Sequence, residues 1–250
     1  MRIPCCPGMA GVDASAQSTF IAQEDIMRQT YRIIGWAALL AGFSYLVQPF
    51  VVALVPAVFG TSERVTDPAV LRGAVWLAFI ESGAFLGVAV GMGILTIGID
   101  ELLGSARSVT GRAHFLVGVA AALGWLLVAS ASAARYSSVI GPASEFGAEG
   151  RMVFFQAQAM DITTGVFVAS IASGIWWIGT AVRSPRAGIL GRPLAAFAGV
   201  VGAFALFPSL FGLPWGLLLQ IPLFIVLGIA FLRHAGRLAP TRSSTKALPA

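Results

Sequence analysis

Charged residues are scarce in this chain. Only 11% of its 250 residues are Asp, Glu, Lys or Arg, whereas 57% are hydrophobic. About a quarter of the residues in a soluble domain are charged, so this composition excludes an ordinary water-facing surface. The mean hydropathy of +0.85 agrees. The composition predicts an all-α, polytopic membrane protein.

Residue types that commonly carry chemistry are also sparse. Cys5 and Cys6 are the only cysteines, and they cannot build a disulfide framework or a zinc site. His114 and His234 fall on different apolar segments, which disfavours a haem held inside the bundle. Lys246, the only lysine, lies outside every apolar segment, so a retinal Schiff base is excluded. HExxH, GxSxG and Walker A motifs are absent. The sequence therefore predicts no metal, no cofactor and no recognised catalytic residue.

Apolar runs of about 20 residues, the length that crosses a bilayer, occur repeatedly along the chain. They predict a bundle of six transmembrane helices. The expected spans are 33–58, 70–99, 113–134, 154–182, 193–211 and 213–232. The short link between the last two predicts an antiparallel hairpin. The expected divisions are a flexible or partly helical segment over 1–30, a six-helix domain over 31–235 and a disordered cytoplasmic tail over 236–250.

Basic residues lie unevenly in the loops between these spans, and this bias predicts orientation. One side collects twelve: Arg2, Arg28, Arg32, Arg107, Arg112, Arg183, Arg186, Arg192, Arg233, Arg237, Arg242 and Lys246. The other side collects four: Arg64, Arg72, Arg135 and Arg151. Both termini are therefore predicted to be cytoplasmic, in a multi-pass protein of the cell membrane. The net charge of +5 reflects this topology and not nucleic-acid binding.

Small residues recur at intervals of four in two spans, a spacing that favours close helix packing in lipid. The stripes are Gly83, Gly87 and Gly91 in the second span and Gly165, Ala169 and Ser173 in the fourth. Each stripe is expected to lie against another helix. The bilayer is the expected partner, and a second copy or another membrane protein could pack on the same stripes.

Two acids fall within the predicted spans, where burial of a charge is costly. Glu81 is expected near the middle of the bilayer and Asp161 about 11 Å below the outer surface. On a helix, Gln158, Asp161 and Thr164 share the face of Gly165, which predicts that Asp161 points inward. The outer half also holds Gln48, Gln220 and Arg135.

These polar residues support two interpretations. In one, an outward-facing polar pocket binds a proton, an ion or a small solute; its members are Gln48, Glu81, Arg135, Gln158, Asp161, Thr164 and Gln220. In the other, Arg135 neutralises Asp161 at the interface, and Glu81 is protonated and hydrogen-bonded in the core. The pocket predicts a small-solute or proton/cation-linked transporter. The alternatives are a non-catalytic membrane subunit and, with less support, an enzyme acting on lipid.

The segment 174-GIWWIGTAVRSPRAGILGRPLAAFAGVVG-202 has a distinctive order: an aromatic helix end, Arg-Ser, a short Pro/Gly loop and a glycine-spaced helix. In this it resembles bacterial six-helix membrane proteins grouped as a domain of unknown function. The resemblance covers about thirty residues together with the chain length and the six spans. It implies the architecture and a bacterial inner membrane, but no activity.

Overall fold

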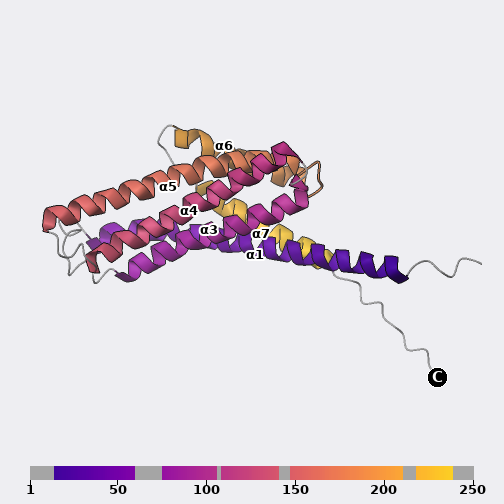
Figure 1. The fold of residues 1–250 in the computed structure, drawn as a ribbon, viewed down its shortest axis with the longest axis horizontal. Helices are drawn as coiled ribbons and strands as arrows, with labels where there is room; N and C mark the ends of the chain where they lie inside the picture. Colours follow the sequence, from indigo (N-terminus) through magenta and orange to yellow (C-terminus); the bar gives the residue numbers. More distant parts are fainter. Residues whose placement is uncertain (1–13, 60–74, 106–107, 141–146, 211–217, 239–250) are drawn as a thin grey trace, which may run out of the picture.

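Six α-helices account for nearly all of the described residues (Figure 1). The computed structural model describes residues 14–59, 75–105, 108–140, 147–210 and 218–238. The helices are α1 (Ala14–Phe59), α3 (Val75–Leu103), α4 (Val109–Ile140), α5 (Ala148–Arg183), α6 (Arg192–Leu210) and α7 (Gln220–Arg237). No strand occurs within these ranges. The predicted all-α class and six-helix bundle are confirmed.

Four of the helices are long and apolar enough to cross a membrane. Among the described residues, the candidate spans are Gln23–Phe50, Phe79–Leu103, Val109–Ala134 and Met152–Arg183. A further apolar stretch, Arg192–Phe207, is shorter. These apolar helices fit an integral membrane protein.

Several helices continue beyond the apolar spans that the sequence predicts. α1 begins at Ala14 and passes through Pro49 without a break, so it extends past the other helices at one end (Figure 1). The connection between the predicted spans 113–134 and 154–182 is shorter than the gap between them, because α4 continues to Ile140 and α5 begins at Ala148. The segments 1–13, 60–74 and 239–250, with Cys5, Cys6, Arg64 and Arg72, lie outside the described residues. Of the predicted tail 236–250, the first two residues belong to α7.

The main helix contacts follow an open chain from α7 through α1, α3, α4 and α5 to α6. The antiparallel hairpin predicted for the last two helices stays a prediction, because the link 211–217 lies outside the described residues. α6 and α7 touch each other only slightly, since each packs on a different neighbour. Gly202 of α6 meets Gly174 of α5, and Gly228 of α7 meets Gly35 of α1. Glycine lets these pairs of backbones approach closely.

Small residues of the predicted stripes also pack inside the chain. A Cβ atom on Gly91 would lie 2.7 Å from the carbonyl oxygen of Ala37 on α1. A Cβ atom on Gly165 would lie 2.7 Å from Val128 on α4. Gly83 differs, because it is exposed and nothing lies within 4 Å of its Cβ position. Association of a second copy through the stripes stays a prediction.

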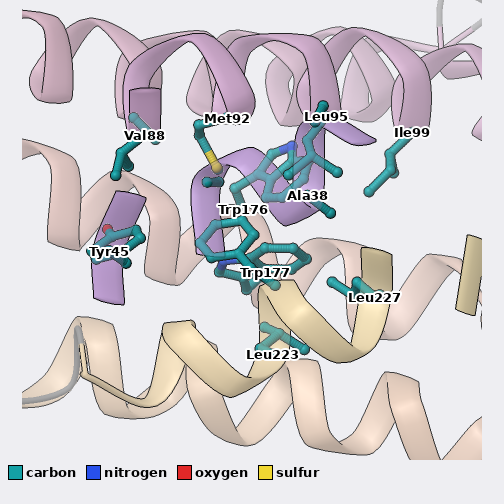
Figure 2. Close-up of a cluster of buried hydrophobic side chains, with 14 of the residues drawn as sticks. Ala38, Tyr45, Val88, Met92, Leu95, Ile99, Trp176, Trp177, Leu223 and Leu227 are labelled. Carbon is teal, nitrogen blue, oxygen red and sulfur yellow. The ribbon is translucent and has the colours of Figure 1, made fainter. Parts of the chain in front are cut away.

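Large aromatic and aliphatic side chains fill the centre of the bundle (Figure 2). Trp176 and Trp177 of α5 are fully buried and meet nearly edge to face, with their ring centroids 4.5 Å apart. Trp177 also contacts Phe224 of α7, with centroids 5.5 Å apart. Tyr45 of α1 lies edge-on to Trp125 of α4. These rings connect helices that are not neighbours in the open chain.

Candidate functional sites

A groove of about 460 Å³ opens between α4 and α5 toward the ends where α4 finishes and α5 begins. Its lining is Leu127, Ser130, Ala131 and Ala134 of α4 with Gln158, Asp161, Thr164, Gly165 and Val168 of α5. Three predicted pocket residues therefore come together here. The prediction that Asp161 points into the bundle is wrong, because its side chain is exposed in this groove.

The groove ends where the two helices come into direct contact. A Cβ atom on Gly124 of α4 would lie 2.7 Å from the backbone nitrogen of Ala169 on α5. Gly165 is similarly close to Val128. The small-residue stripe thus closes the groove on the side away from Asp161. The contact of Gly124 and Gly165 with the facing helix is here called the seal. The carboxylate of Asp161 and the hydroxyl of Thr164 lie on its open side.

Glu81 occupies a different position, on the buried face of α3. Its side chain is only 8% exposed, and Phe85 follows one turn later on the same face. The Phe85 ring stacks on Trp125 at 5.9 Å between centroids. Glu81 does not line the α4–α5 groove. Both acids nevertheless share a level, because Glu81 precedes the end of α3 by 22 residues and Asp161 precedes the end of α5 by 22.

Gln220 lies at the start of α7 and is fully buried. Its amide Nε2 donates to Ser173 Oγ at 3.0 Å, and its Oε1 accepts from the Tyr45 hydroxyl at 3.3 Å. Ser173 in turn donates to the carbonyl of Ser170 at 3.2 Å. This chain, here called the Gln220 bridge, connects α1, α7 and α5. Gln220 is thus a member of the interior and not of the groove.

The two remaining predicted pocket residues are less defined. Gln48 is half-buried on α1, and its amide nitrogen has no hydrogen-bond partner among the described residues. Arg135 belongs to α4, but its side chain lies outside the described part of the structure. Its predicted pairing with Asp161 or Glu81 stays a prediction.

A second polar cluster lies near the opposite end of the bundle, around His114 of α4. Its Nε2 is 3.1 Å from the hydroxyl of Thr180 and 3.2 Å from the carbonyl oxygen of Trp176, both on α5. Asp100 and Arg183 are close enough to act electrostatically on its ring. The sequence had marked His114 only as an unpaired histidine at a helix end.

Buried polar atoms gather around His114, in what is here called the inner cluster. Five of them have no hydrogen-bond partner among the described residues: Thr96 Oγ1, Asp100 Oδ1, His114 Nδ1, Trp176 Nε1 and Arg183 Nη1. Thr96 Oγ1 and Trp176 Nε1 both lie 2.6 Å from the Cβ position of Gly118, so they are no further apart than twice that distance. The i, i+4 pairs Thr96/Asp100 and Thr180/Ser184 are the sequence signal that could have located this cluster.

No protein-family model matches this chain, and neither the curated proteins nor the solved structures searched contain a match. The resemblance to six-helix proteins of unknown function therefore stays a prediction. Among the described residues, no group of three or more His, Cys, Asp or Glu side chains could hold a metal ion.

Proposed function

We propose that this protein is a multi-pass transporter that binds a small cationic solute, or a proton, in the α4–α5 groove. The observation that carries the proposal is the position of Asp161. Its carboxylate lies in an open groove beside Gln158 and Thr164, directly outside a closed contact between two helices. A carboxylate with neighbouring amide and hydroxyl groups suits an ammonium group or a hydrated cation.

The level of the groove supports an outward-facing site. Charged side chains mark one end of the bundle: Glu101, Arg112, Arg183, Arg192 and Arg233. Asp161 and Glu81 lie about 33 Å along their helices from that end, at 1.5 Å per residue. The hydrocarbon layer is about 30 Å thick. Both acids then fall near the far edge of the layer. For Glu81, this differs from the position near the middle of the bilayer that the sequence predicts. Positive charge at the inner end favours the cytoplasmic side there.

The lengths of the last two helices support six passes. α6 and α7 have 19 and 18 residues, which corresponds to about 28 Å each. α6 is therefore long enough to cross most of the hydrocarbon layer. α7 begins at the level of Ser173, where Gln220 bonds to α5, so it crosses the part of the layer toward the Arg-rich end. In this topology both ends of the chain are cytoplasmic.

Transport through this site requires α4 and α5 to separate at Gly124 and Gly165. Polar groups continue along α5 beyond this seal. The Gln220 bridge lies at the level of Ser173, and the inner cluster lies at the level of Thr180. A solute or proton released from Asp161 therefore has hydrogen-bonding groups at two further levels on the same helix. Alternating access would open the seal on one side while closing it on the other.

The test uses purified protein reconstituted in liposomes. Uptake of radiolabelled methylammonium and sodium is measured directly, and proton movement is followed with a trapped pH-sensitive dye. Asp161→Asn keeps the size of the side chain but removes its charge, and we expect at least a tenfold lower initial rate, because charged hydrogen bonds contribute about 1.5–3 kcal/mol. Glu149→Gln is the matched control, since Glu149 is exposed on the same helix outside the groove. Equal rates for wild type and Asp161→Asn would refute the proposal.

A non-catalytic membrane subunit is the second candidate. Trp176, Trp177 and Phe224 are fully buried where α5 faces α7, which leaves no open path through that part of the bundle. This candidate predicts no uptake of any of the three probes by the wild-type protein above that of protein-free liposomes.

A further inference from the structure

A second groove, of about 300 Å³, lies on the outside of the bundle between α3 and α4. Its lining is apolar throughout: Leu86, Ala89, Val90, Gly93 and Ile97 of α3 with Phe115, Val119, Ala122, Leu123 and Leu126 of α4. Here it is called the α3–α4 groove. Both helices are candidate membrane spans over this region, so the groove faces the lipid.

Small residues form the floor of this groove, and large residues form its walls. A Cβ atom on Gly93 would meet only Ala122, at 3.9 Å, so space remains above it. Leu86, Ile97 and Leu123 stand beside it and are 46%, 59% and 53% exposed. The shape is a trough that accepts a narrow, flexible, apolar ligand.

The length of the groove matches one leaflet. It extends over 12 residues, or 11 helical steps, on each helix, from Leu86 to Ile97 and from Phe115 to Leu126. This corresponds to about 16 Å at 1.5 Å per residue. Half of the hydrocarbon layer is about 15 Å thick. Ile97 lies 6 residues before the end of α3, about 9 Å along the helix, and Gly93 lies 10 residues before that end, about 15 Å along it. One acyl chain of the leaflet at the Arg-rich end would therefore occupy the part of the groove from Ile97 to Gly93.

Opposite charges flank the mouth of the groove. One turn beyond Ile97, α3 carries Glu101, and one turn before Phe115, α4 carries Arg112. Both side chains are exposed, and α3 and α4, whose adjoining ends carry them, pack against each other. A phosphate suits the guanidinium of Arg112, and an ammonium with N–H donors suits the carboxylate of Glu101.

We propose that the α3–α4 groove binds one phospholipid with an ethanolamine headgroup, its acyl chain over Gly93 and its headgroup between Arg112 and Glu101. A choline headgroup offers no N–H donor to Glu101, and a glycerol headgroup carries no cation. The headgroup order expected is therefore ethanolamine first, with choline and glycerol weaker. This inference does not depend on transport at Asp161.

The test measures lipid retention by native mass spectrometry of the full-length protein after delipidation. Ethanolamine, choline and glycerol phospholipids with identical acyl chains are titrated separately. Gly93→Leu places a side chain in the trough, and Gly83→Leu is the control, because Gly83 is on the same helix, exposed and outside the groove. We expect one ethanolamine lipid per chain in the wild type and in Gly83→Leu, and at least tenfold weaker retention in Gly93→Leu.

Two protein variants test the charged residues at the mouth of the groove and do not alter the packing of its floor. Arg112→Gln should weaken all three lipids about fivefold, because all three carry a phosphate and a basic residue at the surface contributes about a factor of five. Glu101→Gln should remove the preference for ethanolamine and leave the phosphate contribution unchanged. Three results would each overturn the proposal. The first is equal lipid retention by Gly93→Leu and Gly83→Leu, and the second is a wild type with no headgroup preference. The third is a wild type that retains a second copy of the chain, and no lipid, and loses that copy in Gly93→Leu.

Discussion

Replacing Gln220 by Leu tests whether the Gln220 bridge stabilises the bundle. Leucine has a similar size but removes both hydrogen bonds of the amide. Single interhelical hydrogen bonds in membrane proteins contribute about 0.6 kcal/mol on average and up to about 1.7. The substitution also leaves the hydroxyl of Tyr45 buried without its acceptor, at a cost of about 1–3 kcal/mol. We expect Gln220→Leu to lower the free energy of unfolding by about 2 kcal/mol.

A double-mutant cycle with Tyr45→Phe isolates the 3.3 Å bond between Tyr45 and Gln220. Alone, Tyr45→Phe should cost about 1 kcal/mol, because it removes one hydrogen bond. In the Gln220→Leu background it should instead restore about 1 kcal/mol, because the substitution removes the orphaned hydroxyl. The expected coupling is therefore about 2 kcal/mol, above the scatter of about 0.3–0.5 seen for independent sites.

The assay is reversible unfolding in mixed micelles, with the fraction of denaturing detergent as the variable and helical content as the signal. Gln156→Leu provides the matched control, since Gln156 is exposed on α5 and its replacement should leave stability nearly unchanged. Additive costs for Tyr45→Phe and Gln220→Leu, within that scatter, would refute the bridge.

The same unfolding assay checks two further predictions. Gly124→Ala should cost about 1–3 kcal/mol, because the new methyl would lie 2.7 Å from the backbone nitrogen of Ala169. Gly83→Ala should instead be neutral or stabilise by up to about 1 kcal/mol, because its position is open and alanine favours the helix; equal effects of both substitutions would contradict the packing. His114→Ala should cost about 1–3 kcal/mol through loss of its contacts to α5, and Thr180→Val should cost less because it removes only one of them; no loss of stability in either variant would exclude that contribution.

The architecture could be predicted because lipid imposes simple requirements. A bilayer accepts chains whose backbone groups are paired within a helix, so length and apolar composition locate helices well. Small residues at intervals of four also predicted close contacts correctly: Gly91 packs against α1 and Gly165 packs against α4. These signals are local, and each is read from a single segment.

The faces of single helices were less predictable. Asp161 shares a helical face with Gly165 and Ala169, and this favoured an inward orientation. The structure buries Gly165 and Ala169 against α4 but leaves Asp161 exposed four residues earlier. Packed helices cross at an angle, so one face does not keep the same neighbour along its whole length. A helical projection of one segment cannot show where its contact with a neighbour ends.

Contacts between distant segments gave no local signal. Tyr45 and Gln220 are 175 residues apart, and nothing near either residue indicates the other. The inner cluster had a weak local signal in the spacing of Thr96, Asp100, Thr180 and Ser184. Its centre, His114, was recognised only as a residue without a second histidine. The helix order in space, with α7 on α1, decides which polar residues meet.

The close contact between α1 and α7 has a consequence for biosynthesis. A Cβ atom on Gly228 would lie 2.9 Å from the carbonyl oxygen of Gly35, yet these glycines are 193 residues apart in the chain. At about 5–20 residues per second, the ribosome reaches Gly228 about 10–40 s after Gly35. During that interval, the surface of α1 that α7 later covers has no partner from its own chain. A ribosome that stops before α7 therefore leaves a nascent chain whose α1 surface at Gly35 is uncovered.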